Sequence, residues 1–192
     1  MRAAAALGFP VALKALGPTL LHKTERRAVY LNLKDDASLH AAYDDFSHRF
    51  PTEMTSVLVQ RMAAPGVEMI VGALQDPLFG PLIACGTGGV LVDLLADSAF
   101  RLHPVTASDT AEMIDELKGA RLLRGYRGAP PADEGALRDV LLRVSELVMT
   151  APEIQELDLN PVILTASGAC VADARIRVEH QRPQGGNRRV SY

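Results

Sequence analysis

The 192-residue chain contains no tryptophan, and aromatic residues make up 5% of it. Its formal net charge is −3. Proteins that bind nucleic acid over a broad surface carry a basic face, and those that stack single-stranded bases use aromatic side chains. The sequence has neither property, which argues against a protein that binds nucleic acid.

Cysteine is also scarce. The two cysteines, Cys85 and Cys170, each lie within an apolar run. Two isolated cysteines provide neither a disulfide framework nor a cysteine-based metal site. We therefore expect both to be buried, reduced thiols in a cytoplasmic protein.

No apolar run approaches the roughly 20 residues that a membrane-spanning helix needs. The alanine-rich run at residues 2–7 is followed by Gly8, and helices commonly end at a glycine. This pattern predicts the end of a helix and not a signal segment. We expect the chain to be the downstream part of something longer.

Both common mononucleotide-loop signatures are missing, because the chain has neither a GxxxxGK[ST] loop nor a strand–GxGxxG–helix unit. The run Gly86–Gly89 reads Gly-Thr-Gly-Gly. It fits a nest of backbone amides for an anion, and it fits a glycine bend between two strands equally well.

Hydrophobic periodicity predicts two groups of elements. The first has strands at 9–14, 27–33 and 56–62 and a helix capped by Asp36, and the second has strands at 67–74, 81–85, 90–92, 156–164 and 169–176 and helices at 108–118 and 133–149. Strands and helices in each half predict an α+β fold of two lobes, 1–62 and 63–180, with a ligand cleft between them. A disordered tail is expected at 181–192.

The last two predicted strands carry a candidate metal site. A turn at 165–168 would place Asn160 opposite Asp173 and Asp158 opposite Arg175, with Cβ atoms roughly 4.5–5.5 Å apart. An amide oxygen and a carboxylate at that separation suit Mg²⁺, which prefers oxygen ligands and keeps several waters. The same register also fits a cross-strand ion pair and a strand that ends before a proline, so the pattern leaves both interpretations open.

Three other side chains could carry chemistry. Lys14 ends an apolar strand, where it can direct its charge at a phosphate or simply be solvated. His22, beside Lys23 in a loop, could accept a phosphoryl group or be a surface histidine. Glu68 could bind ribose hydroxyls or face water. At the crossing between lobes, backbone groups of Gln60–Met62 could pair with an adenine edge.

Seven motifs occur in order: Gly8–Lys14, Leu21–Thr24, Val57–Met62, Gly66–Gly72, Asp76–Pro81, Gly86–Gly89 and Glu156–Pro161. Together they resemble the ATP-grasp domain of NDP-forming acyl-CoA synthetases. This group of ADP-forming acetate–CoA ligases is related to the succinyl-CoA synthetase β subunit. The resemblance covers roughly residues 4–179.

The resemblance implies an ATP-grasp fold that holds ATP or ADP and Mg²⁺ between its two lobes. It implies phosphate binding by Lys14, adenine binding by Gln60, Arg61 and Met62, ribose binding by Glu68, Mg²⁺ binding by Asn160 and Asp173, and phosphoryl relay by His22. In such enzymes an acyl-CoA becomes an acyl phosphate, a histidine takes the phosphoryl group, and ADP receives it. The CoA-binding and ligase domains would be partners.

Two departures from the family separate two possible functions. After Lys23 the family has an acidic residue and a glycine pair, whereas this chain has Thr24, Glu25, Arg26 and Arg27. Relative to the family, the first lobe also begins late. The chain is either the ATP-grasp portion of an ADP-forming acid–CoA ligase, or a truncated or degenerate ATP-grasp module with a binding or regulatory role and no catalysis. In either case, the whole reaction needs further domains.

Overall fold

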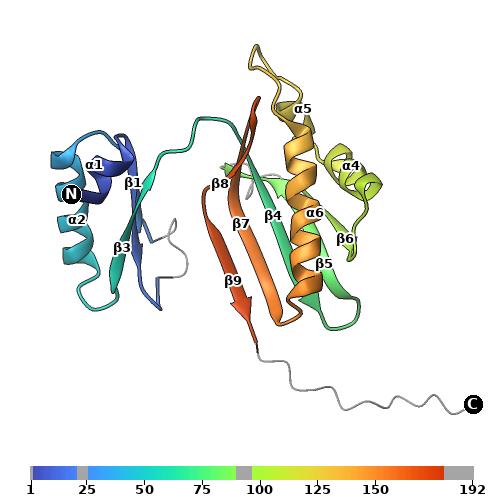
Figure 1. The fold of residues 1–192 in the computed structure, drawn as a ribbon, viewed down its shortest axis with the longest axis horizontal. Helices are drawn as coiled ribbons and strands as arrows, with labels where there is room; N and C mark the ends of the chain where they lie inside the picture. Colours follow the sequence, from blue (N-terminus) through green and yellow to red (C-terminus); the bar gives the residue numbers. More distant parts are fainter. Residues whose placement is uncertain (1, 21–25, 90–96, 180–192) are drawn as a thin grey trace, which may run out of the picture. The chain divides into compact units, whose positions relative to one another are not determined.

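The computed structural model describes residues 2–20, 26–89 and 97–179. The chain divides into two compact units, Met1–Ala63 and Ala64–Tyr192 (Figure 1). Each unit combines helices with an antiparallel sheet, which confirms the predicted α+β class. No helix in the described ranges is long and apolar enough to cross a membrane. Predictions for 90–92 and 181–192 fall outside the described residues.

The first unit has a three-stranded antiparallel sheet in the order β2-β1-β3. Its elements are α1 (Arg2–Leu7), β1 (Val11–Leu16), β2 (Val29–Leu33), α2 (Asp36–Arg49) and β3 (Ser56–Arg61). Helix α1 ends at Gly8, as expected. Gly8 has a φ of 78°, and its amide donates to the Ala4 carbonyl at 2.9 Å.

The cap of α2 is Asp35, so the prediction of Asp36 is wrong by one residue. The Asp35 carboxylate accepts a hydrogen bond from the Ser38 amide at 2.8 Å, and the Asp35 amide donates to the Ser38 hydroxyl at 3.2 Å. This capping box requires the cap to stand three residues before Ser38. Along the helix, Leu39, Ala42 and Phe46 are buried, whereas Tyr43 is exposed.

The second unit has a six-stranded antiparallel sheet in the order β6-β5-β4-β7-β8, with β9 also paired to β7. Its elements are β4 (Val67–Asp76), β5 (Gly80–Thr87), β6 (Ser98–Leu102), α4 (Ala107–Glu116), α5 (Ala120–Leu123), α6 (Glu134–Thr150), β7 (Ile154–Thr165), β8 (Gly168–Val171) and β9 (Ala174–Val178). Helices α4 and α6 cover one face of this sheet (Figure 1).

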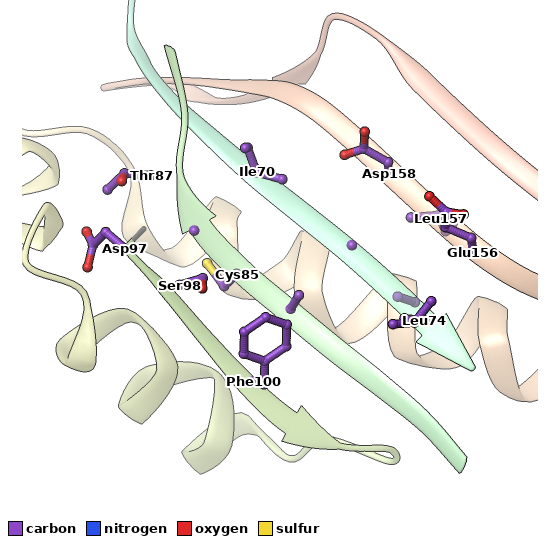
Figure 2. Close-up of a pocket in the computed structure, with 14 residues that line it drawn as sticks. Ile70, Leu74, Cys85, Thr87, Asp97, Ser98, Phe100, Glu156, Leu157 and Asp158 are labelled. Atoms are coloured by element: carbon purple, nitrogen blue, oxygen red, sulfur yellow. The ribbon is translucent and has the colours of Figure 1, made fainter. Parts of the chain in front are cut away.

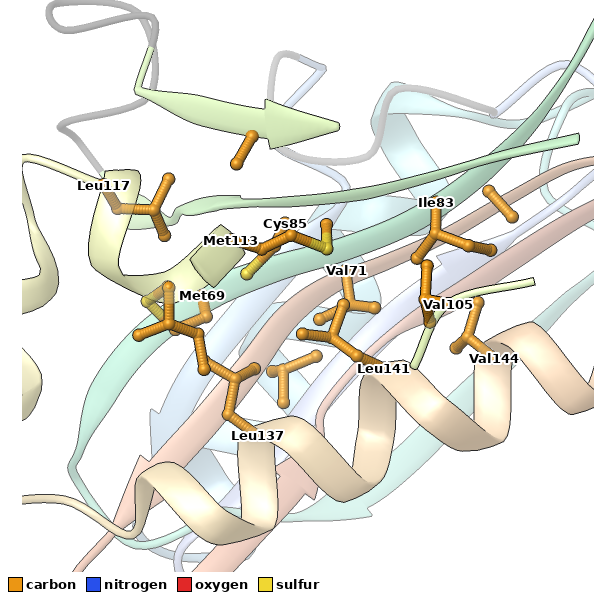
Figure 3. Close-up of a cluster of buried hydrophobic side chains, with 14 of the residues drawn as sticks. Met69, Val71, Ile83, Cys85, Val105, Met113, Leu117, Leu137, Leu141 and Val144 are labelled. Atoms are coloured by element: carbon orange, nitrogen blue, oxygen red, sulfur yellow. The ribbon is translucent and has the colours of Figure 1, made fainter. Parts of the chain in front are cut away.

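The core of the second unit lies between that face and the two helices (Figure 3). Met69, Val71 and Ile83 from the sheet pack there in one cluster with Leu137 and Leu141 from α6. Alternate residues of β4 enter this core, because successive side chains of a strand point to opposite faces. The remaining residues of β4 therefore face away from the helices.

The two cysteines differ in burial. Cys85 belongs to the core, and burial raises the pKa of its thiol to about 12. Cys170 is exposed on β8, so the expectation that both cysteines are buried is wrong. Strand β8 is a short strand at the end of the sheet order, where side chains within an apolar run stay accessible.

Acid is expected to weaken the helix starts. The Asp109 carboxylate in α4 accepts hydrogen bonds from the Thr106 hydroxyl and amide at 2.6 and 2.7 Å, which lowers its pKa below the ordinary value of 3.8. A carboxylate whose pKa is lower in the folded than in the unfolded chain stabilises the fold at a pH above its unfolded-state pKa. This stabilisation is lost as the pH falls through the folded-state pKa. We expect the Tm to drop below about pH 4, and to drop less in Asp109→Asn, as measured by calorimetry. An identical acid loss in the variant would contradict this assignment.

Candidate functional site

The first unit brings two candidate residues to the same face of its sheet. Lys14 pairs with Val29 and Leu58, and Gln60 pairs with Ala12, two residues before Lys14. Directly opposed residues and residues two apart on a strand share a face. Lys14 and Gln60 therefore share the face opposite the α1 and α2 core, and Lys14 is buried, with 7% exposure.

The end of β3 offers backbone groups and not the Arg61 side chain. The Arg61 Nε donates to the Leu7 carbonyl at 2.9 Å, which ties this guanidinium to the end of α1. The Met62 amide donates to the Pro10 carbonyl at 3.3 Å. Neighbouring backbone groups of a strand point in alternate directions, so the Arg61 N–H and C=O point away from β1. Strand β3 is the last in the sheet order of the described residues, so these backbone groups pair with no further strand of that sheet.

Arg26 and Arg27, which the family resemblance predicts to replace glycines, both make contacts within the first unit. The Arg26 guanidinium lies 2.7 Å from the Glu53 carboxylate and 5.4 Å from the Phe50 ring centroid. Arg27 has a φ of 50°, in the left-handed region that favours glycine. Their carbonyls accept hydrogen bonds from Arg49 at 2.6 and 3.1 Å. Arg27 thus has a backbone conformation that suits glycine.

Removing the Arg26 side chain is expected to lower stability slightly. Arg26→Ala loses a half-exposed ion pair and a cation–π contact, which together contribute about 1 kcal/mol. The readout is the shift of the urea midpoint. Arg143→Ala is the control, since it removes a more exposed pair with Asp139 and should change the midpoint less. A larger shift in the control would contradict a structural role for Arg26.

In the second unit, the C-terminal hairpin has the predicted register. Leu164 pairs with Ala169 and Asp158 with Arg175, which confirms both pairings. Continuing this register places Asn160 opposite Asp173, and the Asn160 amide donates to the Asp173 carbonyl at 3.1 Å. The amide and carboxylate side chains therefore start from neighbouring positions on adjacent chain segments.

The donor set fits Mg²⁺. Asn160 and Asp173 supply hard oxygen atoms, and Mg²⁺ commonly takes one or two protein oxygens with waters and phosphates completing its shell. Among the described residues, no group of three or more His, Cys, Asp or Glu side chains could hold a metal.

A β-bulge sets the direction of these residues. Met69 pairs with Val162 and Val71 with Leu159, so Asn160 and Pro161 both lie opposite Ile70. A bulge bends its strand and re-aims a side chain. The simple alternation of the Glu156–Asn160 run does not predict it, although the Asn-Pro pair at the irregularity is a local signal.

Glu68 lies on β4 opposite Ile163, and it is exposed. Within the described part of the chain, its carboxylate has no hydrogen-bonding partner. Gly86 and Thr87 belong to β5, and the Gly88 amide donates to the Glu68 carbonyl at 2.8 Å. This amide is therefore already used, which favours the glycine bend over the anion nest.

The sheet face opposite the α4–α6 core carries a hollow of about 320 Å³ (Figure 2). Its floor is made by Gly72, Ala84 and Gly86, which are neighbours across β4 and β5. Phe100 borders the hollow on one side and Asp158 borders it on the other. The pKa of Asp158 is raised, mainly by partial burial and to a smaller extent by the nearby Glu156 charge. Small residues at alternating strand positions are the sequence signal for this hollow.

Comparison with known proteins identifies the fold family. Residues 1–178 match the ATP-grasp domain family. The chain belongs to the ATP-grasp family. It is 41% identical over 178 residues to subunit beta of the ADP-forming acetate–CoA ligase II of Pyrococcus furiosus, which covers 88% of this chain and 75% of that relative. It is also 44% identical over 177 residues to the ADP-forming acetate–CoA ligase I of Archaeoglobus fulgidus, covering 90% of this chain and 26% of that relative.

Solved structures agree with this assignment of an ATP-grasp domain. The dinucleotide-forming acetyl-coenzyme A synthetase 1 of Ca. Korarchaeum cryptofilum, in complex with coenzyme A, Ca-AMPCP and HgCl⁺, is 40% identical with a TM-score of 0.86, covering 93% of this chain and 80% of that chain. A selenomethionine form of it in complex with coenzyme A and Mg-AMPPCP has its phosphohistidine segment pointing towards the nucleotide-binding site, with 39% identity, a TM-score of 0.81 and the same coverage.

The predicted ATP-grasp fold and the resemblance to ADP-forming acetate–CoA ligases are thus confirmed. This chain spans about three quarters of the P. furiosus subunit beta and about a quarter of the A. fulgidus ligase. The roles of Lys14, Gln60–Met62, Glu68, Asn160 and Asp173 stay predictions. His22 lies outside the described residues.

Proposed function

We propose that the chain is the nucleotide-binding portion of an ADP-forming acid–CoA ligase. It would bind ATP or ADP with Mg²⁺ and exchange a phosphoryl group between a phosphohistidine and the nucleotide. The observation that carries the proposal is the register that sets Asn160 opposite Asp173 beside a β-bulge. Relatives named as ADP-forming ligases, and a related synthetase in complex with Mg-AMPPCP, support it.

Each proposed role follows from the chemistry of the residue. Asn160 and Asp173 would hold Mg²⁺, which when bound neutralises phosphate charge. Lys14 would place a compact positive charge against the phosphates. The Glu68 carboxylate would accept hydrogen bonds from ribose hydroxyls, and the Gln60–Met62 backbone would pair with the adenine edge.

His22 is the proposed phosphoryl relay, because a histidine nitrogen can accept a phosphoryl group and release it to a second acceptor. The partners would be CoA-binding and ligase domains, since the chain spans 26% of an ADP-forming acetate–CoA ligase and is similar to a protein named subunit beta. Those domains would select the acyl group, so the acyl substrate is not set by this chain.

A second candidate is an ATP-grasp module that binds or regulates without catalysis. Arg26 and Arg27 favour it, because their side chains fill positions where close backbone approach to phosphate suits glycine. The glycine-like φ of Arg27 and the ion pair of Arg26 with Glu53 reduce this objection, since the segment stays folded onto its own unit.

Calorimetric titration of the full chain with ADP, with and without Mg²⁺, tests the proposal. We expect saturable heat at millimolar or lower ADP that weakens strongly when EDTA removes Mg²⁺. Heat without Mg²⁺ dependence would support the second candidate. No heat at millimolar ADP, with or without Mg²⁺, would reject ADP binding by this chain.

A further inference from the structure

We infer that Gly88 and Gly89 position the Glu68 carboxylate for a ligand diol. The inference rests on the proposed function, because it assigns the ribose hydroxyls of the nucleotide as that diol. It gives the glycine run at the end of β5 a role in specificity that a simple bend between strands would not have.

Gly88 lies directly against the Glu68 backbone. Its amide donates to the Glu68 carbonyl at 2.8 Å. A Cβ at this position would lie 2.8 Å from the Glu68 carbonyl carbon and 2.9 Å from its oxygen. Because both neighbours are backbone atoms, any side chain here would force the two segments apart.

Gly89 lies against the Glu68 side chain. A Cβ built on it would stand 3.0 Å from Glu68 Oε2. A methyl group at this position would therefore crowd the carboxylate and displace it from the position that it has in the structure. Gly80 has a similar positive φ, 78° against 68° for Gly89. It differs in its surroundings, because no atom lies within 4 Å of a Cβ built on it.

The arrangement leaves Glu68 ready for a ligand. The carboxylate lies beside the position that a Gly89 side chain would take, and no hydrogen bond to its oxygens is found within the described ranges. A carboxylate with two oxygens can accept from both hydroxyls of a cis-diol. Holding it in place beforehand reduces the ordering cost of binding. Gly88 and Gly89 are thus positioning residues that act through Glu68.

The test compares ADP with 2′,3′-dideoxy-ADP by calorimetry in the presence of Mg²⁺. Variants of the full chain are Gly89→Ala, Glu68→Ala, the double variant, and Gly80→Ala as a control with similar backbone strain and open space. We expect Gly89→Ala to weaken ADP about three- to tenfold and Glu68→Ala about tenfold or more. Neither variant should change the affinity for dideoxy-ADP, and Gly80→Ala should change the affinity for neither nucleotide. In the double variant, Gly89→Ala should cause no further loss of ADP affinity beyond that of Glu68→Ala.

Equal losses for both nucleotides, or a full Gly89→Ala effect in the Glu68→Ala background, would overturn the inference. So would a wild-type chain that binds both nucleotides equally, although nucleotide binding itself would then stand. If the wild-type chain binds neither, the proposed function fails separately. NMR of the Glu68 carboxyl carbon then decides the positioning. A change of the Glu68 carboxyl chemical shift in Gly89→Ala but not in Gly80→Ala supports the positioning role of Gly89. An unchanged chemical shift in both variants rejects that role.

Discussion

Asp173→Ala is expected to abolish the Mg²⁺-dependent part of ADP binding, a loss of about 100-fold or more. Asn160 alone would supply a neutral amide oxygen, and a hard divalent cation needs negative charge among its ligands. Asp173 lies opposite Asn160 at the position where the register places a second oxygen donor. Titrating ADP at several Mg²⁺ concentrations measures this loss.

Asp173→Asn is the informative companion variant, because it keeps an oxygen donor and removes one charge. It should bind Mg²⁺–ADP more tightly than Asp173→Ala and more weakly than the wild type. Asp139→Ala, an exposed carboxylate on α6, controls for net charge and should leave binding unchanged. Wild-type binding by Asp173→Ala, with an unchanged Tm, would remove Asp173 from the metal site.

The hairpin register could be predicted because it is fixed by the position of the turn together with the two-residue alternation of side chains along each strand. Once the turn is placed at 165–168, every later pairing is set, and Leu164 with Ala169 and Asp158 with Arg175 follow. The bulge at Asn160 and Pro161 could not be predicted the same way. It depends on pairing with Met69 and Val71 of β4, which lie far away in the sequence.

Where the sequence was less informative, long-range packing was the deciding factor. Strand β6 is only five residues long and gains its order from pairing with β5, so its own pattern does not predict it. Cys170 lies in an apolar run like Cys85, but only Cys85 has helices packed over it. The proximity of Gly89 to Glu68 likewise joins the segment after β5 to β4, and neither segment predicts it alone.

Leu141→Ala is expected to lower the free energy of unfolding of the second unit by about 3 kcal/mol. Leu141 is fully buried on α6, in the cluster that joins this helix to Val71 of β4 (Figure 3). Truncation removes the transfer free energy of the side chain and leaves a cavity that the rigid sheet cannot close. Because the chain has no tryptophan, urea unfolding is best followed by far-UV circular dichroism.

Leu147→Ala is the matched control, since it makes the same change on the same helix at a side chain that is 39% exposed. It should lower the free energy of unfolding by less than about 1 kcal/mol.

The contrast also separates stability from binding, because Leu141 lies on the helix side of the sheet while Glu68 lies on the other face. A folded Leu141→Ala chain should therefore keep its affinity for Mg²⁺–ADP. Equal destabilisation by the two variants would mean that α6 does not pack on the sheet as described, and the candidate site on the opposite face would lose its scaffold.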